Sequence, residues 1–64
     1  MRAYIGVGAN LGDATMQVRA AAEGLRVLGT HWQCSPLYHT APQDADGPYY
    51  VNAVVGLNTS LTAP

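Results

Sequence analysis

The chain has 64 residues and can form at most one small domain. Its composition is 48% hydrophobic and 11% charged, with a formal net charge of −1, so it offers no basic surface for a nucleic-acid backbone and leaves apolar surface that we expect to meet a partner. No apolar run approaches the roughly 20 residues of a membrane span, and the single cysteine excludes an internal disulfide, so we expect a cytoplasmic protein that does not bind membranes.

The first predicted element is a strand over residues 2–8, because Ala3, Ile5 and Val7 recur at every second position. A glycine-rich turn follows it. This turn differs by one residue from a dinucleotide-binding fingerprint, since Leu11 stands where the third glycine is needed, and no acid follows about 20 residues later. We interpret the glycines as those of a sharp turn between a strand and a helix.

A helix is predicted over residues 13–28, with Asp13 as its N-cap and Gly29 just past its end. Inside it, Gly24 costs about 1 kcal/mol relative to alanine. We interpret Gly24 as a point where the helix approaches the sheet closely. The apolar residues at three- and four-residue spacings that predict this helix are Met16, Val18, Ala21, Ala22, Leu25 and Leu28.

Two more strands are predicted, over residues 31–38 and 50–57. Pro36 removes a backbone donor from the first of them and favours an edge strand or a bulge. The second can lie between the other two strands and pair antiparallel with both, as in half of a split β-α-β unit. Its core face is predicted to consist of Val51, Ala53, Val55 and Leu57.

The chain ends in a Thr-Ala-Pro segment, residues 62–64, that is typical of the start of a helix. A single helix would cover only part of one face of the sheet. We therefore expect the chain to be the N-terminal part of a longer protein.

Tyr50 and Asn52 are the candidate binding residues that packing does not explain. Side chains alternate across a strand, so both leave it on the face opposite the predicted core. A phenol ring can stack on a flat heteroaromatic ligand while a carboxamide reads its edge. In the preceding loop, the paired acids Asp44 and Asp46 could bind magnesium, but Asp, Pro and Gly are also what an exposed turn uses, and we favour the turn.

Three segments carry a family resemblance when they are taken together. They are Gly8-Ala9-Asn10-Leu11-Gly12 at the end of the first strand, Ser35-Pro36-Leu37-Tyr38-His39-Thr40-Ala41-Pro42, and Tyr50-Val51-Asn52-Ala53-Val54-Val55. In this order and spacing they resemble the N-terminal half of the 6-hydroxymethyl-7,8-dihydropterin pyrophosphokinase family. Ala9 stands where that family more often has serine, and Ala41 where it often has proline.

The resemblance implies an α+β, ferredoxin-like fold, of which this chain would supply a β-α-β-β portion with an antiparallel sheet and one helix on one face. It also implies transfer of diphosphate from ATP, with Mg²⁺, to the hydroxymethyl group of a reduced pterin in folate biosynthesis. Residues 43–49 would form a loop that closes over the substrates. The substrate-binding residues it implies are Gly8, Asn10, Thr40, Ala41, Pro42, Tyr50 and Asn52, with Tyr50 stacking on the pterin and Asn52 bonding its edge.

The family's motif of arginines and paired aspartates for ATP and magnesium does not occur in this sequence. The resemblance therefore assigns no catalytic residue and no metal ligand to the chain. We expect residues 1–64 to be a single incomplete domain that is inactive by itself, because phosphoryl transfer depends on positioned metal ions and cationic side chains.

An alternative is a non-catalytic binding or assembly module that associates with itself or another chain through an uncovered face of the sheet. A nucleotide-binding α/β half is disfavoured by the glycine spacing described above.

Overall fold

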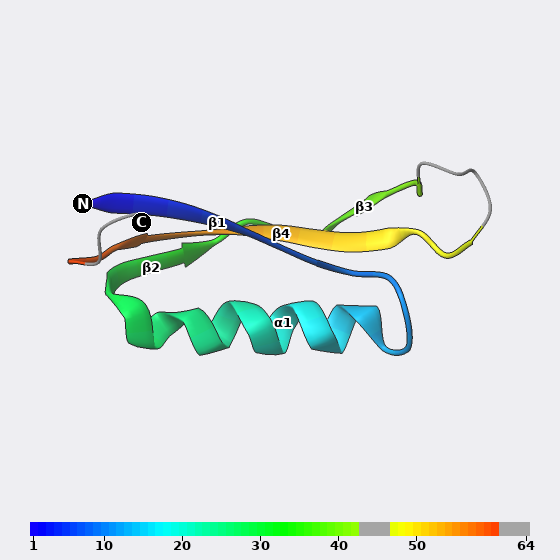
Figure 1. The fold of residues 1–64 in the computed structure, drawn as a ribbon, viewed down its shortest axis with the longest axis horizontal. Coiled ribbons are helices and arrows are strands. Elements are labelled where there is room, and N and C mark those ends of the chain that lie inside the picture. The colour runs from blue at the N-terminus through cyan, green and yellow to red at the C-terminus, as the bar shows by residue number, and fades with distance from the viewer. Residues whose placement is uncertain (43–46, 61–64) are drawn as a thin grey trace.

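The computed structural model describes residues 1–42 and 47–60. They form an antiparallel sheet with one helix on one face, which confirms the predicted α+β class and agrees with the N-terminal portion of a ferredoxin-like fold (Figure 1). The predicted loop acids Asp44 and Asp46 and the predicted helix start at residues 62–64 lie outside the described residues. The elements are β1 (Arg2–Ala9), α1 (Ala14–Gly24), the short 3₁₀ helix η1 (Leu25–Leu28), β2 (Thr30–Cys34), β3 (Tyr38–Thr40) and β4 (Tyr50–Asn58).

Strand β4 is the centre of the sheet. It pairs antiparallel with β1 on one side, and with β2 and β3 on the other. The prediction that the last strand lies between the first two is confirmed. Every backbone position of β1 from Arg2 to Ala9 has a partner in β4, so this pairing runs the full length of β1.

The strand predicted over residues 31–38 is instead two short strands separated by Pro36, which lacks the N–H that a continuous ladder needs. At this break, Ser35 keeps the segment hydrogen-bonded to β4. Its backbone N–H donates to the Val54 carbonyl at 2.9 Å, and its Oγ accepts from the Val54 N–H at 2.9 Å. The hydroxyl therefore replaces a backbone carbonyl in the ladder, and β3 continues along the same edge of β4.

Helix α1 begins as predicted, because the Asp13 carboxylate accepts a hydrogen bond from the Met16 N–H at 3.1 Å. The predicted helical run ends at Leu28, but its last turn is the 3₁₀ helix η1. The interpretation of Gly24 was wrong: a Cβ there would meet no atom within 4 Å. The close approach is at Gly29, where a Cβ would collide with the carbonyl oxygen of Asn58.

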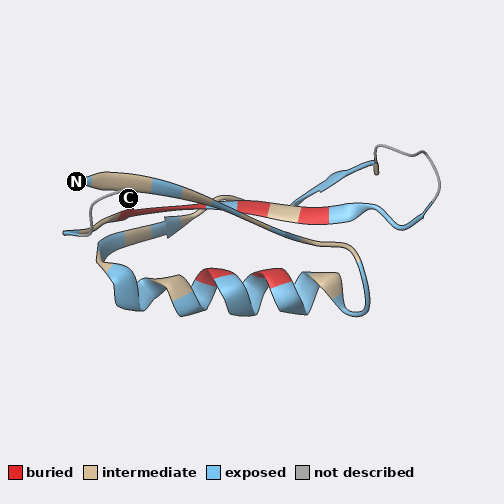
Figure 2. Cartoon of the chain, viewed as in Figure 1, coloured by how far each residue is buried: buried red, intermediate tan, exposed pale blue. Residues whose placement is uncertain are grey.

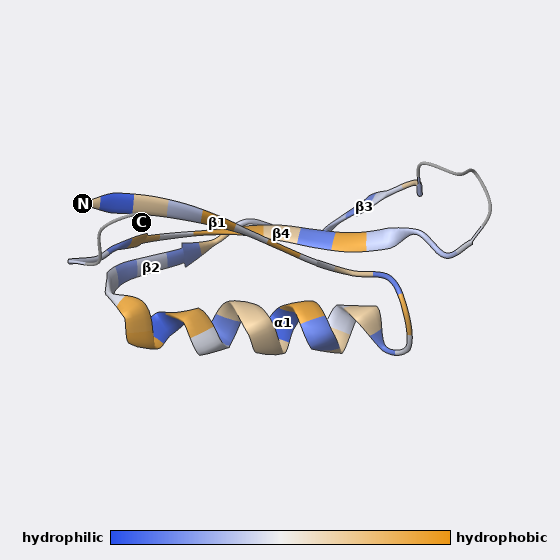
Figure 3. Ribbon diagram, in the orientation of Figure 1, coloured by the Kyte–Doolittle hydropathy of each residue, from blue (hydrophilic) through white to orange (hydrophobic). Residues whose placement is uncertain are grey.

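The hydrophobic core lies between α1 and the helix-facing side of the sheet (Figures 2 and 3). Its strand side is the predicted set, with Val51, Ala53, Val55 and Leu57 all 5% exposed or less. Its helix side is narrower than predicted. Of the six predicted apolar positions only Val18 and Ala22 are buried and Leu25 is half-buried, whereas Met16, Ala21 and Leu28 are exposed.

None of the helices in the described part of the chain is long and apolar enough to cross a membrane.

Candidate ligand-binding site

The face of the sheet turned away from α1, here called the outer face, carries the residues that the sequence singled out. Tyr50 and Asn52 both lie on it, because the residues that alternate with them in β4 face the core. Tyr50 is 40% exposed. The prediction that this pair shares a face away from the hydrophobic interior is confirmed.

The pairing register places residues of β1 and β3 on either side of Asn52 in β4. Gly8 of β1 and Tyr38 of β3 are its direct partners on either side, and Thr40 is the partner of Tyr50. Directly paired residues of antiparallel strands place their side chains on the same face. The outer face at this end of the sheet therefore combines residues far apart in sequence.

The Asn52 carboxamide lies next to residues of all three strands at this end of the sheet. Its Nδ2 donates to the Thr40 hydroxyl at 2.8 Å and lies 3.4 Å from the Tyr50 carbonyl oxygen. On the other side, a Cβ added to Gly8 would lie 2.8 Å from Asn52 Oδ1. The carboxamide thus extends across β4, from Thr40 on one flank to the bare backbone of Gly8 on the other.

The remaining predicted residues lie near these three without bonding to them. Asn10 follows the end of β1, and Ala41 and Pro42 follow the end of β3, all at the same end of the sheet as Tyr50. Among the described residues, no hydrogen bond links any of the three to Asn52. The structure thus brings together Gly8, Thr40, Tyr50 and Asn52, and places the other three at the rim.

Tyr38 is a member of this surface that the sequence reasoning did not name as a binding residue. It pairs with Asn52, lies on the outer face and is 46% exposed. The signal was present, since Tyr38 and Thr40 are two residues apart and must share a face if the segment is a strand. The predicted strand ended at Tyr38, and this boundary left Thr40 outside it.

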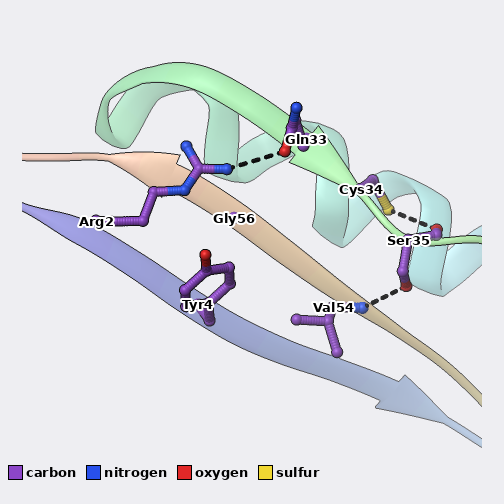
Figure 4. Close-up of a pocket in the computed structure, with 7 residues that line it drawn as sticks. All are labelled: Arg2, Tyr4, Gln33, Cys34, Ser35, Val54 and Gly56. Atoms are coloured by element: carbon purple, nitrogen blue, oxygen red, sulfur yellow. Dashed lines mark hydrogen bonds between the residues drawn. The ribbon is translucent and has the colours of Figure 1, made fainter.

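A depression of about 510 Å³ lies farther along the outer face and begins at Val54, which lines it (Figure 4). In it the Arg2 guanidinium donates to the His31 carbonyl oxygen at 2.8 Å, to Asn58 Oδ1 at 3.3 Å and to Gln33 Oε1 at 3.1 Å. These bonds link β1, β2 and β4. None of the predicted binding residues lines this depression; its lining is Arg2, Tyr4, Gln33, Cys34, Ser35, Val54 and Gly56.

The titratable side chains of the described residues do not form a metal-binding cluster, and the two described carboxylates have partners elsewhere. No group of three or more His, Cys, Asp or Glu side chains gathers among the described residues to hold a metal ion. Asp13 is engaged as the helix cap, and Glu23 pairs with Arg26 at 3.0 Å on the surface of the helix. What converges on the outer face is an aromatic ring, a carboxamide and a hydroxyl, which is the set needed to stack on and orient a flat polar ligand.

Known proteins match this chain over nearly its whole length. The sequence model of the 7,8-dihydro-6-hydroxymethylpterin-pyrophosphokinase (HPPK) family matches residues 4–64. A 2-amino-4-hydroxy-6-hydroxymethyldihydropteridine pyrophosphokinase of Methylorubrum extorquens is 37% identical over 68 residues, covering 95% of this chain and 40% of its own. One of Pseudomonas putida is 36% identical over 63 residues, covering 95% and 52%. The chain spans about half the length of these relatives, and no solved structure gives a significant match.

Proposed function

The chain belongs to the HPPK family, and from this premise we propose that it takes part in the ATP-dependent transfer of diphosphate to the hydroxymethyl group of 6-hydroxymethyl-7,8-dihydropterin, a step in folate biosynthesis. Both relatives are named as pyrophosphokinases of a hydroxymethyl dihydropteridine, which supports the substrate. The observation that carries the proposal is the placement of Tyr50 and Asn52 on the outer face, beside Thr40 and Gly8.

In this proposal the described residues bind and orient the pterin. The Tyr50 ring stacks on the bicyclic system, and the Asn52 carboxamide bonds the edge of the pyrimidine half. Stacking alone is indifferent to ring chemistry, so the amide supplies the discrimination between pterins and other flat rings. Gly8 leaves room above the strand, while Asn10, Ala41 and Pro42 form the rim of the site.

ATP and Mg²⁺ are the further ligands that we propose for the reaction. The described residues do not fit a magnesium site, because they contain no cluster of three metal-ligating side chains and the two described carboxylates are engaged elsewhere. We therefore derive no step through the metal or the nucleotide. We also propose a cytoplasmic location, a reducing compartment that suits an unpaired Cys34 thiol.

The test is a titration of the chain with 6-hydroxymethyl-7,8-dihydropterin, followed by ligand fluorescence, for the wild type, Asn52→Ala and Tyr50→Leu. We expect saturable binding that weakens about 3- to 10-fold in either variant, since a hydrogen bond or a stacked ring contributes about 1 kcal/mol. Thr15→Ala, on the exposed surface of α1, is the control and should bind normally. Absence of binding by the wild type, or equal binding by all four proteins, would refute the pterin assignment.

A second function, as a binding or assembly module, is favoured by the apolar side chains on the outer face. Tyr4 is 72% exposed and Val54 is 37% exposed. Val54→Asp tests this second function, because Val54 lies on the outer face of β4. Val51 and Val55 are buried against α1, so a charge there would disturb the core. If sedimentation shows a concentration-dependent oligomer that Val54→Asp dissolves while pterin does not bind the wild type, this second function replaces the first.

A further inference from the structure

The orientation of the Asn52 carboxamide is set by its neighbours. A carboxamide has a donor end and an acceptor end that differ only by a half-turn, so the surrounding polar atoms decide which end faces where. The Tyr50 carbonyl oxygen, which can only accept, lies 3.4 Å from Nδ2. If the amide were turned over, Oδ1 would face that oxygen, and two acceptors would repel each other.

Thr40 then fixes the donor end. A hydroxyl can accept or donate, and here its oxygen lies 2.8 Å from Nδ2, a shorter distance than that to the Tyr50 carbonyl. With Nδ2 committed to the side of β3, the Thr40 hydroxyl acts as an acceptor. The amide group can no longer rotate freely, although it lies on an exposed face.

The acceptor end points to the opposite flank, over Gly8. The Gly8 backbone has no side chain there, and a Cβ would come within 2.8 Å of Oδ1. Among the described residues no donor bonds to Oδ1. A ligand edge that arrives above Gly8 therefore meets a carbonyl oxygen whose direction is already determined.

From this geometry we infer that Thr40 is a positioning residue: its hydroxyl holds the Asn52 carboxamide so that the carbonyl oxygen is presented over Gly8, and the site selects heteroaromatic rings that carry an N–H donor at the edge. The inference rests on the proposed function for the identity of the ring. In a pterin the donors of this kind are the ring N3–H and the exocyclic 2-amino group. A ring edge that offers only hydrogen-bond acceptors would be repelled by Oδ1, which is also an acceptor.

The first experiment needs no ligand and reports on the amide itself. In the 64-residue chain, the Asn52 side-chain NH₂ resonances in ¹⁵N–¹H spectra should show one proton protected and shifted by its hydrogen bond to Thr40. Thr40→Val, which removes the hydroxyl and keeps the shape, should abolish this signature, while Thr40→Ser should retain it. Thr15→Val, the same change on the exposed helix surface, is the matched control and should leave the resonances unchanged.

The second experiment measures selectivity with three probes: the pterin, its 3-methyl analogue and its 2-desamino analogue. The wild type should bind at least one analogue about 3- to 10-fold more weakly than the pterin, the ratio expected for one lost hydrogen bond. In Thr40→Val that ratio should fall toward one, because the carbonyl oxygen is no longer held in place. Thr40→Ser should restore the wild-type ratio, which a general loss of packing would not do.

The outcomes separate this inference from the proposed function. If the wild type binds no pterin, the function is refuted, and the inference is refuted with it as a statement about ligand choice. If pterin binds but Thr40→Val weakens all three probes equally, or leaves the Asn52 resonances unchanged, the function stands and the positioning role of Thr40 is refuted.

Discussion

At the scale of single residues, the two glycines Gly6 and Gly8 provide a sharp comparison. Both lie in β1 and both face outward, but a Cβ at Gly8 would come 2.8 Å from Asn52 Oδ1 whereas one at Gly6 would meet nothing within 4 Å. We predict that Gly8→Ala displaces the carboxamide and weakens pterin binding about 3- to 10-fold, the effect of losing one hydrogen bond. Calorimetric or fluorescence titration of the two alanine variants measures it.

Gly6→Ala is the matched control. Alanine is no worse than glycine in a strand whose backbone is already extended, so the free energy of unfolding should not fall in this variant. Equal affinities for Gly6→Ala and Gly8→Ala would contradict the assignment of the ligand edge to the space above Gly8.

The same residues show where sequence reasoning reached its limit. The common face of Tyr50 and Asn52 was predictable, because alternation along a single strand is a local property. The bond between Thr40 and Asn52 was not. It requires the register of β3 against β4, and residues 43–46 lie between these strands in sequence, so the separation of the two residues alone does not fix the pairing.

At the scale of elements, the beginning of α1 rests on one side chain. Asp13 accepts from the Met16 N–H at 3.1 Å and satisfies one of the four donors that a helix start leaves free. We predict that Asp13→Ala lowers the free energy of unfolding by about 1 kcal/mol, whereas Asp13→Ser, which also caps, loses only a fraction of that. Urea denaturation followed by circular dichroism distinguishes the two, and an Asp13→Ala protein as stable as the wild type would show that the cap contributes nothing.

Strand β4 contains a second matched pair, Val54 and Val55, which are neighbours on opposite faces. Val55 is 0% exposed under α1, and Val54 is 37% exposed on the outer face. We predict that Val55→Ala lowers the free energy of unfolding by about 2–3 kcal/mol, because it loses buried apolar surface and leaves a cavity. Val54→Ala should lower it by about 0.5 kcal/mol or less. Comparable unfolding midpoints for the two variants would mean that the face assignment of β4 is wrong.

Elements with strong local periodicity were predicted well, and those that depend on a neighbour were not. The regular alternation of β4 identified every core residue on that strand. The helical spacing identified α1 but overestimated the apolar face, because spacing along the chain does not show which positions the sheet covers: Met16 is 64% exposed, and Leu28, in η1, is 37% exposed. Gly24 was misread for the same reason: its sequence shows a missing side chain, but not what lies opposite.

At the scale of the whole molecule, the two ends of the outer face differ: one carries the candidate binding site, and the other carries hydrogen bonds that join the strands. At one end Gly8, Thr40 and Asn52 form the candidate site; at the other, the Arg2 guanidinium links three strands through Asn58, Gln33 and the His31 carbonyl. Gly56 permits this link, since a Cβ there would lie 2.8 Å from Arg2 Nη2. Asn52 and Gly56 are four residues apart on one extended strand, which separates their backbones by about 13 Å.

This division predicts that stability and ligand binding can be changed independently. Arg2→Gln removes the charge and the forked donor, and should lower the free energy of unfolding by about 1–2 kcal/mol, since it loses hydrogen bonds that join β1 to β2 and β4. Its affinity for the pterin should remain within about twofold of the wild type under conditions where both are folded, because no bond of Arg2 reaches the residues around Asn52. Arg19→Gln, on the exposed side of α1, carries the same change of charge and should alter neither quantity.

Asn52→Ala should show the reverse behaviour. It loses the two hydrogen bonds of Nδ2 on an exposed face and should unfold within about 1 kcal/mol of the wild type, yet its affinity for the pterin should fall about 3- to 10-fold. Urea titrations with and without saturating pterin measure both quantities in one series, because a ligand that binds only the folded chain at 100 times its Kd adds about 2.7 kcal/mol to stability. That increment should survive in Arg2→Gln and shrink in Asn52→Ala. If Arg2→Gln also loses this ligand-induced increase in stability, the two ends of the sheet are coupled, because a change at the Arg2 end then alters binding at the Asn52 end.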